Sequence, residues 1–358
     1  MENQPSHRLL VSSHAPAAEE GGILCLDFDA QSGGFRNLRR MASLDQPHFM
    51  TACSLQGPVY ANDSPGFGSG GNESIVALSL EGETLRLLGR VDSWGSATCH
   101  LALDGEGRVL VSVNYSSGNM CAYQLREGGE FGERGSEIFH EGSGPNDDRQ
   151  DAAHPHCAVF SPDNKRVWIA DLGTDRVEPY EVDFQTAGLL KPIGVSALRM
   201  RPGAGPRHVR FSRDGSLFAV VNELDSTLAV YRTGDSNIPV AELGVVSTLP
   251  EDFRGKTTCA DVAFSRCGGW VFASNRGHDS LAVCRVEEDR LELFDVVSSG
   301  GRGPQNFWIS EDGQWLLCAN MPGDCVVSFR VAELVAGHGK VVSRISVKMP
   351  SCLLEIRA

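Results

Sequence analysis

Residues 154–183 read HPHCAVFSPDNKRVWIADLGTDRVEPYEVD, and the prediction of the fold begins with this stretch. Short runs rich in Val, Ile, Phe and Tyr alternate here with turn residues such as SPDN. This pattern is typical of β-hairpins. The apolar residue Phe160 stands before the turn, and the polar residue Asp171 follows 11 residues later. The spacing gives a template that can be compared with the rest of the chain.

The same 11-residue spacing occurs five times. Successive apolar anchors are 57, 51, 53 and 45 residues apart, a period typical of propeller blades or solenoid turns. Each repeat contains four strand-like segments, and a lone four-stranded sheet must stack against neighbours to bury both of its faces. The repeats therefore predict propeller blades. The five pairs are Leu103 to Asn114, Phe160 to Asp171, Phe211 to Asn222, Phe264 to Asn275 and Ile309 to Asn320.

Two further repeats complete the predicted fold. Residues 47–80 have the same outline, and the N-terminus supplies strand-like runs at residues 8–13 and 22–28 without an inner strand before them. The last residues, PSCLL at 350–354, repeat the proline-led opening of the inner strands at Pro47, Pro155, Pro206 and Pro304. We therefore predict an all-β, seven-bladed β-propeller, a single domain over residues 1–358, in which the C-terminal strand joins the N-terminal blade and closes the ring. Tandem β-sandwiches are the alternative, but linkers between the repeats are absent.

Composition restricts the functional classes. The net charge of −14 is spread along the chain, which disfavours nucleic acid and anionic membranes as partners. No apolar run approaches the roughly 18 residues of a membrane helix, and the N-terminus lacks a signal-peptide pattern, so we expect a cytoplasmic protein. Eleven cysteines without a C-x-x-C pair indicate buried, reduced thiols. The glycine-rich stretch at residues 66–71 resembles a dinucleotide motif, but a strand follows it, so we expect a loop and no cofactor.

The blade topology predicts where a site would lie. In a propeller the opening of each inner strand and the end of the second strand meet on one face, near the central channel. Arg207 and Glu223 occupy positions that other repeats fill with different residue types, so the blade does not require them. The recurring Asn or Asp is most simply a turn residue. The candidates from three consecutive repeats are His156, Asp171, Arg207, His208, Asn222, Glu223, Asn275, Arg276 and His278.

His154 and His156 share one face of a predicted strand, as two ligands of a zinc ion would. No Cys, His or Asp pair at a recognisable ligand spacing accompanies them. We therefore favour catalytic or substrate-binding histidines and predict no metal.

Three segments carry a resemblance to a known family. Residues 154–183, GAGPRHVRFSRDGSLFAVVNELDSTLAVY at 203–231 and DVAFSRCGGWVFASNRGHDSLAVCRVEED at 261–289 resemble the lactonase family of seven-bladed propellers. That family includes bacterial-type 6-phosphogluconolactonase and fungal 3-carboxy-cis,cis-muconate lactonizing enzyme. The resemblance implies a site formed by His156 (or His154), Arg207, Glu223 and Arg276. The sequence departs from the family at Gln305 and Met321, which affects the expected details of substrate binding.

The expected activity is hydrolysis of a sugar lactone, namely 6-phospho-D-glucono-1,5-lactone of the pentose phosphate pathway. Glu223 and His156 would activate water and deliver a proton, and which of them is the base stays open. Arg207 would stabilise the oxyanion, and Arg276 with His208 would bind an anionic group such as the 6-phosphate. A carboxymuconate lactonizing enzyme and a non-catalytic interaction scaffold are the alternatives. Further expected substrate contacts are His154, Asp171, Asn222, Asn275 and His278.

Overall fold

The computed structural model describes residues 6–70, 73–185, 189–193 and 197–357. Its strands form seven antiparallel sheets, six with four strands and one with five. The chain groups into two compact units. The first unit comprises Met1–His14, Ile23–Arg40 and Arg210–Arg357, and the second comprises Ala15–Gly22 and Met41–Val209.

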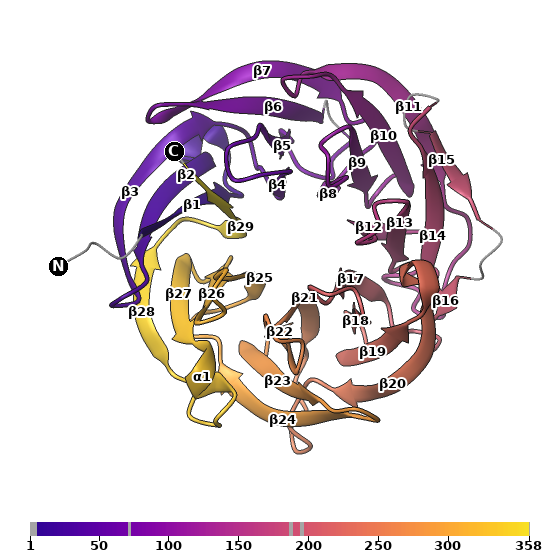
Figure 1. The fold of residues 1–358 in the computed structure, drawn as a ribbon, viewed down its shortest axis with the longest axis vertical. Coiled ribbons are helices and arrows are strands. Elements are labelled where there is room, and N and C mark those ends of the chain that lie inside the picture. The colour runs from indigo at the N-terminus through magenta and orange to yellow at the C-terminus, as the bar shows by residue number, and fades with distance from the viewer. Residues whose placement is uncertain (1–5, 71–72, 186–188, 194–196, 358) are drawn as a thin grey trace. The chain divides into compact units, whose positions relative to one another are not determined.

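Four sheets belong wholly or mainly to the first unit, and Figure 1 labels their strands. Each sheet after the N-terminal one is a simple meander of four consecutive strands. The sheets are β29 (Pro350–Ile356), β1 (Ser6–Ser13), β2 (Gly22–Asp29) and β3 (Gly34–Ser43); β17 (Pro206–Phe211), β18 (Leu217–Asn222), β19 (Thr227–Thr233) and β20 (Pro239–Ser247); β21 (Thr258–Phe264), β22 (Trp270–Arg276), β23 (Ser280–Val286) and β24 (Leu291–Ser298); and β25 (Pro304–Ile309), β26 (Trp315–Asn320), β27 (Cys325–Arg330) and β28 (Val341–Ser346).

The second unit holds the other three sheets. Two are four-stranded meanders, and in the third a short fifth strand, β16, pairs with β14 beside β15. The sheets are β4 (Met50–Ala52), β5 (Val59–Asp63), β6 (Ser74–Glu81) and β7 (Thr84–Asp92); β8 (Thr98–Leu103), β9 (Val109–Asn114), β10 (Asn119–Leu125) and β11 (Phe131–Phe139); and β12 (Pro155–Phe160), β13 (Arg166–Asp171), β14 (Arg176–Asp183), β15 (Leu189–Pro192) and β16 (Leu198–Arg199).

The core lies between neighbouring sheets. The second strands are almost wholly buried, as in β18, where every residue from Leu217 to Asn222 is buried. The fourth strands are largely exposed, as in β7. In the first unit the fully buried Trp315 packs edge-on against Phe28 at 5.3 Å between ring centroids. Apolar second and third strands that are buried on both faces explain why these repeats need neighbours.

The C-terminal strand completes the N-terminal sheet, as predicted. β29 pairs antiparallel with β1 from Arg8 opposite Ile356 to Ser12 opposite Cys352. The predicted all-β fold with seven blades, and the addition of the last strand to the first blade, are confirmed. The single domain over residues 1–358 stays a prediction.

The proline-led openings are confirmed for four inner strands and wrong for one. β12, β17, β25 and β29 begin at proline, but β4 begins at Met50, three residues after Pro47. The reason is local, because Oδ1 of Asn62 accepts the backbone N–H groups of His48 and Phe49 at 2.8 and 2.9 Å. These two amides are hydrogen-bonded to a side chain, so the ladder of β4 begins only after them.

The glycine-rich stretch behaves as expected where it can be seen. Residues 66–70 lie in turns and bends, and the strand β6 follows from Ser74. Gly71 lies outside the described residues. Without a helix after the turn, this loop lacks the N-terminal amides that bind a dinucleotide phosphate.

Helices are short in the described chain. They are α1 (Val331–Leu334) and two 3-10 turns, Ala17–Glu19 and Asp235–Asn237. In this part of the protein no helix is long and apolar enough to cross a membrane.

Candidate active site

Within a sheet, the two kinds of predicted site position lie beside each other. Pro155 at the opening of β12 pairs with Asp171 at the end of β13, and Thr258 of β21 pairs with Arg276 of β22. The antiparallel hairpins therefore place the opening of an inner strand next to the end of the second strand, as the topology predicted.

A cluster of three imidazoles and one guanidinium lies in the second unit, and we call His100, His156, Arg207 and His208 the His–Arg cluster. All four side chains are buried. The His208 ring lies 5.6 Å from that of His156 and 5.3 Å from that of His100, between centroids. Nη1 of Arg207 lies 3.1 Å from Nε2 of His208. Phe49 covers the cluster, with its ring 4.0 Å from the His100 ring.

The contacts determine the protonation of this cluster. A guanidinium only donates hydrogen bonds, so Nε2 of His208 accepts from Arg207 and carries no proton. Burial, followed by the positive charge of Arg207, lowers the pKa of His156 well below its usual value. His156 is therefore an uncharged imidazole at neutral pH. Among the residues that the structure describes, none hydrogen-bonds to its buried Nδ1.

Glu223 and Arg276 form an ion pair in the first unit, which we call the Glu–Arg pair. Nη2 of Arg276 lies 2.8 Å from Oε2 of Glu223, whose side chain is only 4% exposed. The guanidinium also donates to the carbonyl of Cys259 at 3.0 Å and lies 3.5 Å from Oε1 of Gln305. These contacts offset the cost of burying the carboxylate. A quarter of the Arg276 side chain stays exposed, so it can still meet an anion.

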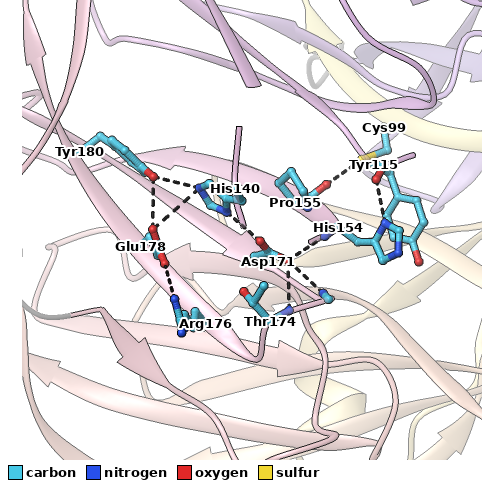
Figure 2. A network of polar contacts seen from close by, with 11 residues as sticks. Cys99, Tyr115, His140, His154, Pro155, Asp171, Thr174, Arg176, Glu178 and Tyr180 are labelled. Carbon is cyan, nitrogen blue, oxygen red and sulfur yellow. Dashed lines mark hydrogen bonds and ion pairs between the residues drawn. The ribbon is translucent and has the colours of Figure 1, made fainter. Parts of the chain in front are cut away.

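Asp171 anchors a network of polar contacts in the second unit, shown in Figure 2. Its Oδ1 accepts backbone N–H groups from His154, Gly173 and Thr174 at 2.8, 2.9 and 3.2 Å. Its Oδ2 lies 2.7 Å from Nδ1 of the buried His140. Asp171 thus fills the turn role proposed for the recurring Asn or Asp, and a contact of Asp171 with substrate stays a prediction.

Both ring nitrogens of His154 have partners within the protein. Nδ1 lies 2.9 Å from the carbonyl of Tyr115, and Nε2 lies 3.1 Å from the carboxylate of Asp151. The ring also stacks on that of Tyr115 at 4.5 Å between centroids (Figure 2). Of the two histidines in the HPH motif, only His156 has a ring nitrogen that no described residue occupies.

The asparagine candidates are held by hydrogen bonds to residues in or next to the sheets. Asn275 donates to the carbonyl of Thr248 at 2.8 Å and accepts from its hydroxyl at 2.6 Å. Asn222 donates to Thr227 at 2.9 Å, and within the described chain its buried Oδ1 has no partner. Substrate contacts by these two residues stay predictions.

His278 lies in the turn after β22. Its Nδ1 is 2.7 Å from the hydroxyl of Ser280, and its ring packs edge-on against Phe253 at 4.5 Å. Nothing in these contacts tests the predicted role in substrate binding.

Sequence reasoning did not select His100 or Phe49, although a signal exists for both. His100 stands three residues before the anchor Leu103, as His208 stands three residues before the anchor Phe211. Phe49 holds the same place after Pro47 that His208 holds after Pro206. Comparing all repeats at this register would have found them.

A metal centre was not predicted, and the described part of the chain contains no group of three or more His, Cys, Asp or Glu side chains placed to hold an ion. The two histidines of the HPH motif are not arranged to bind one ion together, because both ring nitrogens of His154 are bonded, to Asp151 and Tyr115.

The family model of the seven-bladed β-propeller lactonases matches residues 8–355. The chain therefore belongs to the lactonase family of seven-bladed β-propellers, as its motifs indicated. The predicted enzyme class, a lactonase, is confirmed with it.

Alignments with relatives cover nearly the whole chain. A 6-phosphogluconolactonase of Bacillus subtilis is 28% identical over 345 residues, which are 96% of this chain and 96% of that protein. A 6-phosphogluconolactonase of Formosa agariphila is 26% identical over 327 residues, 90% of this chain and 92% of that one. The solved structure of a periplasmic gluconolactonase of Pseudomonas aeruginosa has a TM-score of 0.91 at 24% identity and covers 99% of both chains, a likeness of fold.

Proposed function

We propose that this lactonase hydrolyses 6-phospho-D-glucono-1,5-lactone to 6-phosphogluconate in the pentose phosphate pathway. The names of the relatives support a sugar lactone. The observation that carries the chemistry is the buried Arg207 guanidinium beside unprotonated imidazole nitrogens. A positive charge that is shielded from water attracts a developing oxyanion more strongly than an exposed charge does.

We assign water activation to His156. Its imidazole is uncharged and its Nδ1 has no partner in the described chain, so it can accept a proton from water. Glu223, by contrast, is bonded to Arg276 at 2.8 Å, so its carboxylate already has a partner. Water attacks the lactone carbonyl as its proton passes to His156. Arg207 stabilises the oxyanion, the ring C–O bond breaks, and His156 returns the proton to the leaving ring oxygen.

We assign binding of the 6-phosphate to Arg276. Its guanidinium is partly exposed and is oriented by Glu223 and the Cys259 carbonyl. Both hydrogens of Nη2 are bonded to Glu223 and Cys259, so a phosphate would be bound through Nη1 and by the positive charge of the guanidinium. Glu223 is then a positioning residue, and His208 orients Arg207.

A pH-stat assay tests the proposal, because each lactone opened releases one proton. After correction for spontaneous opening, the wild type should hydrolyse 6-phosphogluconolactone. Arg207→Ala should lose at least about a hundredfold in kcat while retaining the wild-type circular dichroism. Arg290→Ala, which removes an exposed arginine, is the matched control.

Two results would contradict the proposal. If the wild type were inactive here but active in a muconate absorbance assay, the enzyme would be a lactonizing enzyme. If it were inactive in both assays, the fold would serve as a binding scaffold.

We further propose a cytoplasmic location and a single folding domain. All eleven cysteines are free, and nine of them are buried, which suits a reducing compartment. Cell fractionation tests the location. A single calorimetric unfolding transition is expected for one domain, and two separate transitions would contradict it.

A further inference from the structure

A pocket lies in the first unit, at the opposite end of the strands from the Glu–Arg pair. Its volume is about 240 Å³, and Phe211, Phe264 and Ile309, the last residues of β17, β21 and β25, form part of its wall. In the β21–β22 hairpin, Thr258 pairs with Arg276 at one end and Phe264 pairs with Val271 at the other. Six residues of extended strand separate the two ends by roughly 20 Å.

Three arginines line this pocket, Arg210, Arg213 and Arg266, and none of its described lining residues is acidic. The repeat does not require them. The position of Arg210 is Val159 in the preceding repeat and Trp308 in the last one. We call this feature the arginine pocket.

Two of the arginines are fixed by neighbours. Arg266 donates to the carbonyls of Ile309 and Ser310, each at 2.9 Å. Glu311 lies 2.5 Å from Arg213 and 3.3 Å from Arg266, so one carboxylate serves two guanidinium groups. This arrangement leaves an excess of positive charge and holds the donors in place.

Arg210 differs from the other two. In the part of the chain that the structure describes, no hydrogen bond or ion pair occupies its guanidinium, although it lines the pocket. An arginine with five donors and no acceptor in the described protein, in a pocket that Phe211 and Phe264 also line, is a suitable partner for an oxyanion.

We propose that the arginine pocket binds a small organic anion, with a phosphate or carboxylate head group on Arg210 and a flat apolar body against Phe211 and Phe264. The volume limits the ligand to about one ring with its head group. The protein carries a net charge of −14, so the arginines can attract an anion only at short range. The affinity for the anion should fall as the salt concentration rises. This site is independent of the proposed lactone hydrolysis.

Calorimetric titration with three probes tests the proposal. Phenyl phosphate should bind the wild type at low salt, more tightly than inorganic phosphate, because only the former has an apolar body. Benzoate distinguishes a carboxylate from a phosphate head group. Arg210→Gln should weaken phenyl phosphate binding by roughly tenfold or more, while Arg290→Gln, which removes an exposed charge elsewhere, should not.

Arg276→Gln separates this site from the proposed active site. Phenyl phosphate binding that survives Arg210→Gln but is lost with Arg276→Gln would place the probe at the Glu–Arg pair and overturn the proposal. Absence of phenyl phosphate binding to the wild type would overturn it as well. Lactone hydrolysis by Arg210→Gln should equal that of the wild type, so the two proposals fail separately.

Discussion

Replacing Asp171 tests the network of Figure 2 most directly. Most of the equivalent positions in the other repeats hold asparagine, as at Asn114, Asn222 and Asn275. We compare Asp171→Asn, which keeps one acceptor oxygen, with Asp171→Ala, which removes both. The side chain is fully buried, so water cannot replace the lost acceptors.

The size of each effect follows from the contacts. Alanine leaves the N–H groups of His154, Gly173 and Thr174 without their acceptor, and the His140 ring loses its 2.7 Å partner. A buried donor without a partner costs about 1–3 kcal/mol, and two of these donors are only part-buried, so we expect a loss of roughly 3–5 kcal/mol. Asparagine keeps the oxygen that accepts the three backbone N–H groups, but it places an NH2 group opposite Nδ1 of His140, which loses its acceptor at a cost of about 1–2 kcal/mol.

Equilibrium unfolding in urea measures both variants. The midpoint should fall slightly for Asp171→Asn and strongly for Asp171→Ala, with similar slopes. Equal midpoints for the two variants would refute the reasoning, because the backbone acceptor would then be unimportant. A KM raised more than tenfold in Asp171→Asn, at unchanged stability, would instead show that Asp171 contacts the substrate.

Four further predictions concern other contacts. Burial and Arg207 lower the pKa of His156, so its neutral form persists below pH 6.5. The value of kcat/KM should therefore stay constant as the pH falls to 6.5 and somewhat below. A fall in kcat/KM on the acidic side with its midpoint at or above pH 6.5 would contradict the assignment. His156→Gln should lower kcat by about 10² to 10⁴ in the same assay. Arg276→Gln should raise KM for the phosphorylated lactone at least tenfold and leave KM for glucono-1,5-lactone nearly unchanged; equal effects would remove the phosphate role. Asn306→Ala should cost about 2–4 kcal/mol in urea unfolding, because Asn306 bonds Asp261 and the Leu353 amide at 2.8 Å, and wild-type stability would disprove that link.

The fold was predictable because the spacing of apolar and polar residues in each repeat reflects which strand is buried. An apolar anchor such as Phe264 and a polar residue such as Asn275 recur at a constant spacing, since these second strands bury five or six residues each. The start of β4 was not predictable, because it depends on the contact of Asn62 with two backbone amides. The short strand β16 lies outside the repeat and has no counterpart to compare with.

The candidate site was predictable only in part. Arg207 and Glu223 stand out as departures from the repeat, and no structure is needed to notice them. The uncharged state of His156 depends on burial and on the nearby Arg207, which no spacing reveals. The bond between Glu223 and Arg276 likewise requires side-chain positions on two different sheets.

The pairing of β29 with β1 has a consequence for synthesis. His7 and Glu355, which are hydrogen-bonded at 2.7 Å, are separated by 348 positions, and closing such a loop costs on the order of 5 kcal/mol in chain entropy. The edge of β1 therefore stays unpaired until β29 has been synthesised. Until then the nascent chain exposes a strand edge that another chain can pair with, so this protein is most prone to aggregate before β29 is available.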